Sequence, residues 1–218
     1  MSKRTTRRVL FVGNSFTARN DLPGLVSGLA AAGADPIELA TRLISAGGAS
    51  LRRHWNAGDA AAAITAGIHD WVVLQEQSTL PVKNPRRFHE NVREFAPVIG
   101  AAGSRLALYM TWARREAPET QDDLDRAYEE IGEEVGGVVV PVGRVWQACL
   151  AAPDAPLLHD ADGSHPTLAG SFLAACAFHE CLVGPLGADA VEAVEVELGI
   201  DERRVLHQVS VRCARVEN

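Results

Sequence analysis

The sequence predicts an α/β fold in which helices cover both faces of a parallel sheet. Five short, mostly apolar runs alternate with segments of helical periodicity along the 218 residues. Strands that are buried on both faces read as continuous apolar runs, and their alternation with helices is typical of parallel sheets. We therefore expect a three-layer α/β/α sandwich around a five-stranded parallel sheet. The predicted strands are Val9–Val12, Ile37–Ile44, Asp70–Gln75, Leu106–Met110 and Val138–Val142.

The first two helical segments are indicated by a cap and by composition. Asn20 or Asp21 can cap a helix that should end near Gly33. An alanine-rich stretch that follows the second strand should be helical as far as about Gly67. Each segment joins two predicted strands, as a crossover helix does in a parallel sheet.

The later helices are indicated by apolar spacing. Asn84 and Pro85 open one of them, and Pro97 should bend that helix or end it early, because proline removes a backbone donor. The segment Leu168–Val183 is apolar nearly all round, which predicts a buried helix. The apolar faces of the two preceding helices are Phe88, Val92, Phe95 and Ile99, and Leu124, Tyr128, Ile131 and Val135.

The length suits one sizeable domain. We expect residues 1–218 to form it, with a core at about residues 8–184 and a helical extension at 185–218 packed on that core. Asp201 can cap a helix in the extension. Val209, Val211 and Cys213 alternate as a strand would, so the helix is the favoured of two interpretations.

Composition narrows the classes of partner and compartment. The net charge of −7 argues against a nucleic-acid partner, and no run approaches the length of a membrane span. The basic N-terminus followed by Val9–Gly13 imitates a signal peptide, but its apolar run is too short and Asn14 interrupts it. Four cysteines without metal-ligand spacing are expected to be buried, reduced thiols in a cytoplasmic protein. The oligomeric state is left open.

Two short segments carry chemistry. Gly13-Asn14-Ser15-Phe16-Thr17 follows the first predicted strand, where open parallel sheets bind ligands. Asp162-Gly163-Ser164-His165-Pro166-Thr167 precedes the last long apolar helix. Together the segments supply the serine, histidine and aspartate of a nucleophilic hydrolase, with His165 as base and Asp162 as its orienter. Taken singly, each also suits ordinary turn and capping residues.

The second segment leaves two alternatives. Asp160 lies in the same short stretch as His159 and Asp162. It is therefore an alternative to Asp162 as the residue that orients His165. A metal site formed by His159, Asp160, Asp162 and His165 would need a zinc spacing that the segment lacks, so no metal is expected.

These two segments make the chain similar to the SGNH (GDSL-type) hydrolases. The resemblance covers the region from about Val9 to about Val183. Gly13-Asn14-Ser15 is similar to their first block, and Asp162-Gly163-Ser164-His165 to their last. The resemblance implies a flavodoxin-like fold, a Ser15–His165–Asp162 triad and no cofactor. It implies a serine esterase that hydrolyses a small acyl ester, acetyl above all, of a sugar-like or other small molecule.

The middle blocks of that family match less closely. The resemblance implies an oxyanion hole formed by the backbone amides of Ser15 and Gly48 and by one side-chain amide. The usual Gly-x-Asn-Asp is replaced by Leu74-Gln75-Glu76-Gln77-Ser78, which is similar to a Gln-Gly-Glu segment of some carbohydrate acetylesterases. Gln75 is the expected donor and Gln77 its rival. Both glutamines would also suit a purely structural role in the loop.

Further residues are expected near the substrate: Asn14, Gln77, Trp112 and His54. Trp112 follows the fourth strand and can stack on a sugar or pack in the core.

Two other functions compete with the esterase. The first segment also resembles a flavodoxin-type phosphate loop, which would hold a flavin phosphate. A catalytically inactive interaction domain is the third interpretation, supported only by the acidic face of the helix around Leu124.

Overall fold

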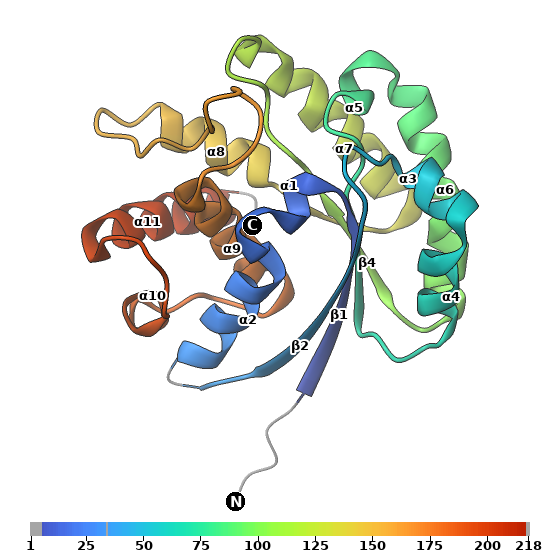
Figure 1. Ribbon diagram of the computed structural model, residues 1–218, viewed down its shortest axis with the longest axis horizontal. Coiled ribbons are helices and arrows are strands. Elements are labelled where there is room, and N and C mark those ends of the chain that lie inside the picture. Colours follow the sequence, from blue (N-terminus) through green and yellow to red (C-terminus); the bar gives the residue numbers. More distant parts are fainter. Residues whose placement is uncertain (1–5, 34, 217–218) are drawn as a thin grey trace, which may run out of the picture.

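The computed structural model describes residues 6–33 and 35–216. It contains a five-stranded, wholly parallel sheet in the order β2-β1-β3-β4-β5, with helices on both sides (Figure 1). The predicted three-layer α/β/α fold is confirmed. The strands are β1 (Thr6–Gly13), β2 (Glu38–Ser45), β3 (Trp71–Leu74), β4 (Arg105–Tyr109) and β5 (Val138–Val140).

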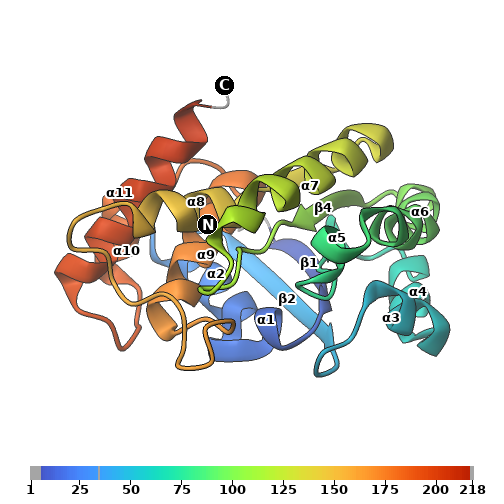
Figure 2. The same cartoon turned by 90° about the horizontal axis from the view of Figure 1, so that it is seen from above.

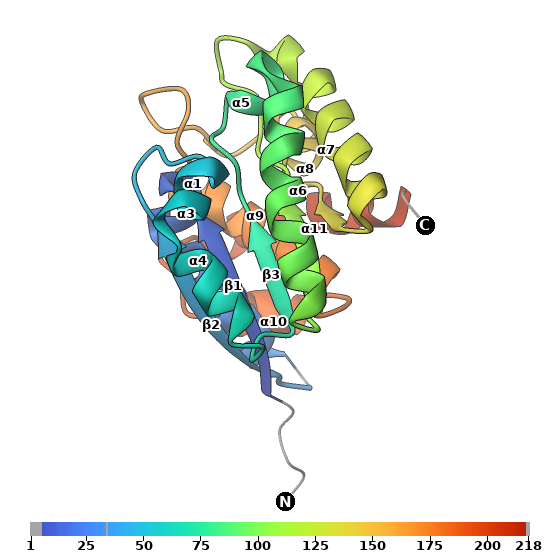
Figure 3. The same ribbon diagram turned by 90° about the vertical axis from the view of Figure 1, so that its right-hand side faces the viewer.

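Two sets of helices cover the two faces of the sheet. One face carries α2 and α8 to α11, and the other carries α3, α4, α6 and α7 (Figures 1 and 3). The helices are α1 (Ser15–Ala18), α2 (Leu22–Ala32), α3 (Leu51–Ala57), α4 (Asp59–Thr65), α5 (Leu80–Lys83), α6 (Pro85–Ala101), α7 (Gln121–Val135), α8 (Val142–Leu150), α9 (Leu168–Leu182), α10 (Ala188–Ala193) and α11 (Ile200–Val216).

The interior strand β1 contributes side chains to both cores. Val9 and Phe11 point into the core shared with α2 and α9, whereas Leu10 and Val12 point into the core shared with α4 and α6. Successive strand side chains face opposite sides, so a strand covered on both sides must be apolar throughout. This explains why the run that begins at Val9 shows no alternation.

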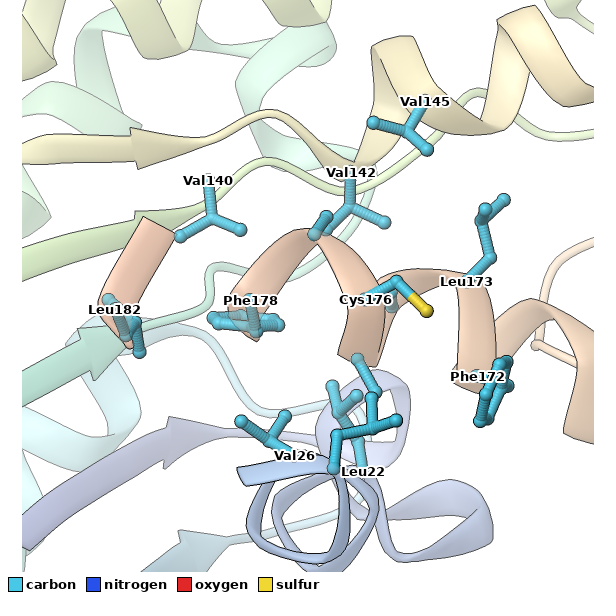
Figure 4. Packing of buried hydrophobic residues seen from close by; sticks show 14 of the residues in the cluster. Leu22, Val26, Val140, Val142, Val145, Phe172, Leu173, Cys176, Phe178 and Leu182 are labelled. Atoms are coloured by element: carbon cyan, nitrogen blue, oxygen red, sulfur yellow. The ribbon is translucent and has the colours of Figure 1, made fainter. Parts of the chain in front are cut away.

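Helix α9 is the most enclosed helix of the first layer. Leu22 and Val26 of α2 pack on one side of it, and Val142 and Val145 of α8 lie on the other (Figure 4). Helix α11 packs against α9 and α8, with Leu206 fully buried. The helix predicted in the C-terminal extension is therefore confirmed, and the alternative strand there is wrong.

Three boundaries differ from the sequence predictions. Helix α6 continues past Pro97 to Ala101, because core side chains on both sides of the proline hold it in place. The alanine-rich stretch is two helices, divided at Gly58, whose φ of 83° few other residues adopt. The fifth strand stops before Pro141, and Val142 instead begins α8, which the apolar run concealed.

The expected burial of the cysteines holds only in part. Cys149 and Cys176 are buried, but Cys181 and Cys213 are only half-buried, so the expectation of four buried thiols is wrong for two of them. Within the described residues, no helix combines the length and the apolar character that crossing a bilayer requires.

The order of the strands creates one crevice. The chain leaves β1 toward α2 on one face, and leaves the neighbouring strand β3 toward α6 on the other. In such sheets the crevice lies outside the carboxyl ends of the strands, where the connections diverge. Figure 2 shows α1 at this edge, with α5 and the loops after β2 and β4 around it. Ser15 and Gln75 follow the two strands that flank the crevice, β1 and β3.

Candidate active site

Ser15 lies in a tight turn immediately after β1. It is the first residue of α1, and Asn14 is the N-cap, whose Oδ1 accepts a hydrogen bond from the Phe16 backbone N–H at 3.1 Å. The first turn of a helix leaves backbone N–H groups without intrahelical partners. The turn therefore places the Ser15 hydroxyl and its backbone amide together at the edge of the sheet.

His165 reaches Ser15 across 150 residues of sequence. The distance from Ser15 Oγ to His165 Nε2 is 2.8 Å, and the distance from His165 Nδ1 to Asp162 Oδ2 is 2.5 Å. A carboxylate only accepts hydrogen bonds, so Nδ1 carries the ring proton and Nε2 accepts from the serine hydroxyl. This geometry joins a hydroxyl, a base and an orienting carboxylate in one chain of hydrogen bonds.

Asp162 is held as an anion. Its hydrogen bond from the His165 ring, together with backbone N–H bonds of 2.9 Å from His165 and Ser164, keeps the pKa of this carboxyl well below its usual range. Asp160, the rival orienter, instead pairs with Arg19 and accepts from the Ala161 N–H. The structure thus brings Asp162, and not Asp160, to the imidazole.

A short hairpin carries the histidine and the aspartate. His159 and Pro166 form an antiparallel bridge, and the Asp160 N–H donates to the His165 carbonyl at 2.8 Å. Gly163 turns the chain with a φ of 68°, and a Cβ there would lie 2.3 Å from Glu116 Oε1. The positive φ favours glycine here, and a larger residue would also have to displace the Glu116 carboxylate.

Trp112 supports the hairpin from beneath. Its indole N–H donates to the Ser164 carbonyl at 3.0 Å. Its ring stacks on Trp146 with centroids 3.7 Å apart, and on Phe16 at 5.1 Å. Only 2% of Trp112 is exposed. Of the two expected roles of Trp112, core packing is the one that its stacking shows, and the residue links the Ser15 turn to the hairpin that carries His165.

Gln75 lies beneath the serine turn rather than in the crevice. Its Oε1 accepts from the Asn14 N–H at 2.9 Å and from Thr17 Oγ1 at 3.0 Å, and its amide group donates to the Glu76 carbonyl. It is fully buried. Its Oε1 and one N–H are engaged beneath the turn and the side chain is fully buried, so Gln75 lies where it supports the serine turn and not where a substrate is exposed to it.

The side chains of Asn14 and His54 also form hydrogen bonds with the backbone near the serine. Asn14 is buried and its side-chain NH₂ donates to the Ala49 carbonyl at 2.9 Å, which ties the β1 turn to the loop after β2. Burial lowers the pKa of His54, and its Nε2 donates to the Gly13 carbonyl at 2.7 Å. Neither side chain is available to a substrate, contrary to the sequence prediction.

Gly48 and Gln77 remain open to the crevice edge. Gly48 is exposed in a turn after β2 with a φ of 62°, one residue before the Ala49 carbonyl that Asn14 holds. Gln77 is half-buried, and its Oε1 accepts from the backbone N–H and the hydroxyl of Thr79, each at 3.0 Å. Its side-chain NH₂ makes no hydrogen bond to any described residue in the structure.

The buried carboxylate of Glu76 was not foreseen from the sequence. It accepts from the backbone N–H groups of Leu51 and Gln77 at 3.1 and 2.7 Å, and from Asn91 Nδ2 at 2.8 Å. Burial raises its pKa despite these donors. Glu76 thus ties the start of α3 to the loop after β3. Its partners lie 15 and 25 residues away, so no local pattern could have revealed them.

The alternative metal site finds no support in the geometry. His159 turns away from the hairpin, and its Nε2 donates to the Ala113 carbonyl at 3.1 Å. Over residues 6–33 and 35–216, no group of three histidine, cysteine, aspartate or glutamate side chains is arranged to hold a metal ion.

Comparisons with known proteins address the fold. No family model matches the sequence, and a search of curated proteins gives no match. A candidate SGNH hydrolase from Slackia heliotrinireducens is 28% identical, with a TM-score of 0.70 over 82% of this chain and 100% of its own.

Two further solved structures share the fold at lower identity. A DUF4886 family protein from Bacteroides uniformis is 17% identical, with a TM-score of 0.74 over 97% of this chain and 96% of its own. A catalytic mutant of an acetylxylan esterase from Geobacillus stearothermophilus is 18% identical, with a TM-score of 0.63 over 83% and 95%. The chain therefore has the fold of the SGNH (GDSL-type) hydrolases.

Proposed function

We propose that this protein is a serine esterase that cleaves a small acyl ester through a Ser15–His165–Asp162 triad. The observation that carries the proposal is the hydrogen-bonded chain from Ser15 Oγ through His165 to Asp162. The similarity to structures described as a hydrolase and an acetylxylan esterase supports it. A flavin-phosphate loop would leave this arrangement without a role.

The reaction begins with attack of Ser15 Oγ on the ester carbonyl carbon. His165 Nε2 takes the hydroxyl proton, and the adjacent Asp162 carboxylate stabilises the imidazolium that forms. His165 then gives the proton to the departing alkoxide as the C–O bond breaks. Water, deprotonated by the same nitrogen, attacks the acyl-enzyme, releases the acid and restores Ser15.

The developing oxyanion needs donors that are not already engaged. The backbone N–H groups of Ser15 and Gly48 lie on the two loops that Asn14 joins. Gln77 replaces Gln75 as the proposed side-chain donor, because Gln77 is half-buried and its NH₂ has no partner among the described residues, whereas Gln75 is fully buried and donates to the Glu76 carbonyl. Donors aimed at a developing charge act mainly in the transition state.

The proposed acyl group is small, acetyl above all, and the alcohol is a sugar or another small molecule. The similarity to an acetylxylan esterase supports the acetyl preference. Reaction with a fluorophosphonate probe, followed by peptide mass spectrometry, tests the nucleophile. Labelling at Ser15 that disappears in His165→Ala supports the proposal. Labelling at another serine, or hydrolysis that survives in the unlabelled Ser15→Ala variant, would refute it.

The orienter can be tested with two matched carboxylates. Asp162→Asn should lower kcat by about 10³- to 10⁴-fold, because the amide no longer selects the required imidazole tautomer. Asp160→Asn should leave kcat within about twofold of wild type, since its carboxylate contacts Arg19 and not His165. Steady-state kinetics on 4-nitrophenyl acetate decides between them. The reverse pattern would make Asp160 the orienter.

Gln77→Ala should lower kcat by about 10²- to 10³-fold with little change in the free energy of unfolding. Gln77→Glu keeps the oxygen that holds Thr79 and removes the donor, so it should be slow as well. Gln75→Ala should instead destabilise the protein, because it leaves the Asn14 N–H without its partner. Urea denaturation and kinetics separate these effects. Normal kcat in both Gln77 variants would remove Gln77 from the oxyanion hole.

A further inference from the structure

A small cavity lies on the α5 side of the molecule, among the loops that follow β3 and β4. It has a volume of about 170 Å³ and lies between α5 and the segment that joins β4 to α7. Figure 2 shows α5 and the start of α7 beside the edge at which α1 lies. The walls are largely apolar and include Val82, Ala117 and Leu124. A cavity of this size accommodates a few carbon atoms rather than a long acyl chain.

The cavity is connected to the catalytic machinery through its own walls. Trp112 lines it, and the same side chain bonds to the carbonyl of Ser164, the neighbour of His165. Ser78 also lines it and directly follows Gln77, the proposed oxyanion donor. The cavity thus shares walls with the segments that hold His165 and Gln77, which is the basis for assigning it to one end of a substrate bound at Ser15.

The rim of the cavity carries positive charge only. Lys83 and Arg114 are the charged side chains among the described residues that line it. Both are exposed, and neither forms an ion pair or side-chain hydrogen bond with a residue described in the structure. The acidic neighbour Glu116 lies against Gly163 instead. Both cations are therefore available to an anionic group at the cavity.

We propose that this cavity is a subsite for an anionic group, so that the preferred substrate is an ester bearing a carboxylate or a phosphate on a short apolar spacer. The inference rests on the proposed esterase function. Lys83 and Arg114 attract and hold the anion at the rim, while Val82 and Leu124 pack against the spacer. Charged groups at a half-open site recognise an anion more strongly than a neutral ester and lose that advantage in salt.

Two pairs of matched esters test the subsite. In the first pair the acyl part varies, 4-nitrophenyl hydrogen succinate against its methyl ester. In the second the alcohol varies, 3-acetoxybenzoate against its methyl ester. The wild-type protein should prefer the anionic member of at least one pair by about tenfold in kcat/KM, and high salt should shrink the preference. Equal or reversed preference in both pairs would overturn the proposal.

Charge-removing variants identify the residues. The double variant Lys83→Met with Arg114→Met should abolish the preference, measured as the ratio of kcat/KM for the two members of each ester pair. Arg86→Met is the matched control, because it removes a nearby, 89% exposed cation that does not line the cavity. A preference that survives in the double variant, or that Arg86→Met removes equally, would refute a role for the cavity.

A binding measurement separates failure of the subsite from failure of the esterase. Amide NMR shifts of the wild-type protein and of the double variant are followed during titration with 3-hydroxybenzoate and with its methyl ester. Saturable shifts around Ser78 to Lys83 for the acid alone, lost in the double variant, support the subsite even if no ester is hydrolysed. Absent shifts, or equal shifts with both compounds, would overturn the subsite and leave the proposed hydrolysis standing on its own tests.

Discussion

Ser15→Ala is expected to lower kcat for ester hydrolysis by about 10⁴- to 10⁶-fold while the protein stays folded. The hydroxyl forms one described side-chain contact, at 2.8 Å to His165, and the N-cap bond of the turn comes from Asn14 instead. Removing the nucleophile therefore eliminates the covalent route with little loss of packing. Single-turnover and steady-state kinetics on 4-nitrophenyl acetate measure the effect, and circular dichroism checks the fold.

His165→Ala, and the double variant with Ser15→Ala, complete that experiment. Residues that act as one unit are strongly non-additive, so each single change should cost about as much as both together. Multiplicative losses would indicate that Ser15 and His165 act independently, and wild-type turnover in Ser15→Ala would exclude the triad. A variant that loses activity and helical signal together would report misfolding, and Ser15→Cys, which keeps a nucleophile of similar size, distinguishes that case.

Trp112→Ala should reduce the free energy of unfolding by about 3–5 kcal/mol, because it removes a fully buried indole that stacks on both Trp146 and Phe16. Trp112→Phe retains an aromatic ring but removes the donor to the Ser164 carbonyl together with part of the indole, and the lost hydrogen bond alone costs about 1–3 kcal/mol. That variant should also lower kcat with little change in KM, since the hairpin that positions His165 loses its anchor. Urea denaturation and steady-state kinetics provide the two measurements.

Trp146→Phe is the matched control for the indole bond. It makes the same change in the same stack, but the Trp146 Nε1 is buried with no hydrogen-bond partner among the described residues. It should therefore leave kcat near wild type. If Trp112→Phe and Trp146→Phe lower kcat equally, the stack as a whole positions the hairpin, and the Trp112 hydrogen bond does not.

The sheet was predictable because its determinants are local. The interior strands carry short apolar runs, and Val9 and Phe11 alternate with Leu10 and Val12 between two apolar cores, so no polar position interrupts that run. The edge strand β2 is less apolar. Boundaries failed where two elements share one apolar run. Val142 reads as the end of a strand, yet Pro141 ends the ladder and the following residues form α8.

The proximity of the candidate catalytic residues was inferable from motif position, whereas the roles of the surrounding polar residues were not. Gln75 and Gln77 offer the same amide chemistry, and only the contact with the Asn14 N–H, 61 residues away, turns Gln75 under the serine. The indole of Trp112 likewise faces the hairpin because the Ser164 carbonyl accepts its N–H. Long-range hydrogen bonds of this kind leave no periodic trace in a sequence.

The separation of Ser15 and His165 by 150 residues has a consequence for how activity returns when the denatured chain refolds. Local helical turns form in about a microsecond. Closing a loop this long carries an entropy cost that is offset only when the sheet and α9 have packed. Helical signal should accordingly recover before the protein can react with a fluorophosphonate. The rate of covalent labelling at Ser15 would then report the last stage of folding, when the segments that carry Ser15 and His165 come together.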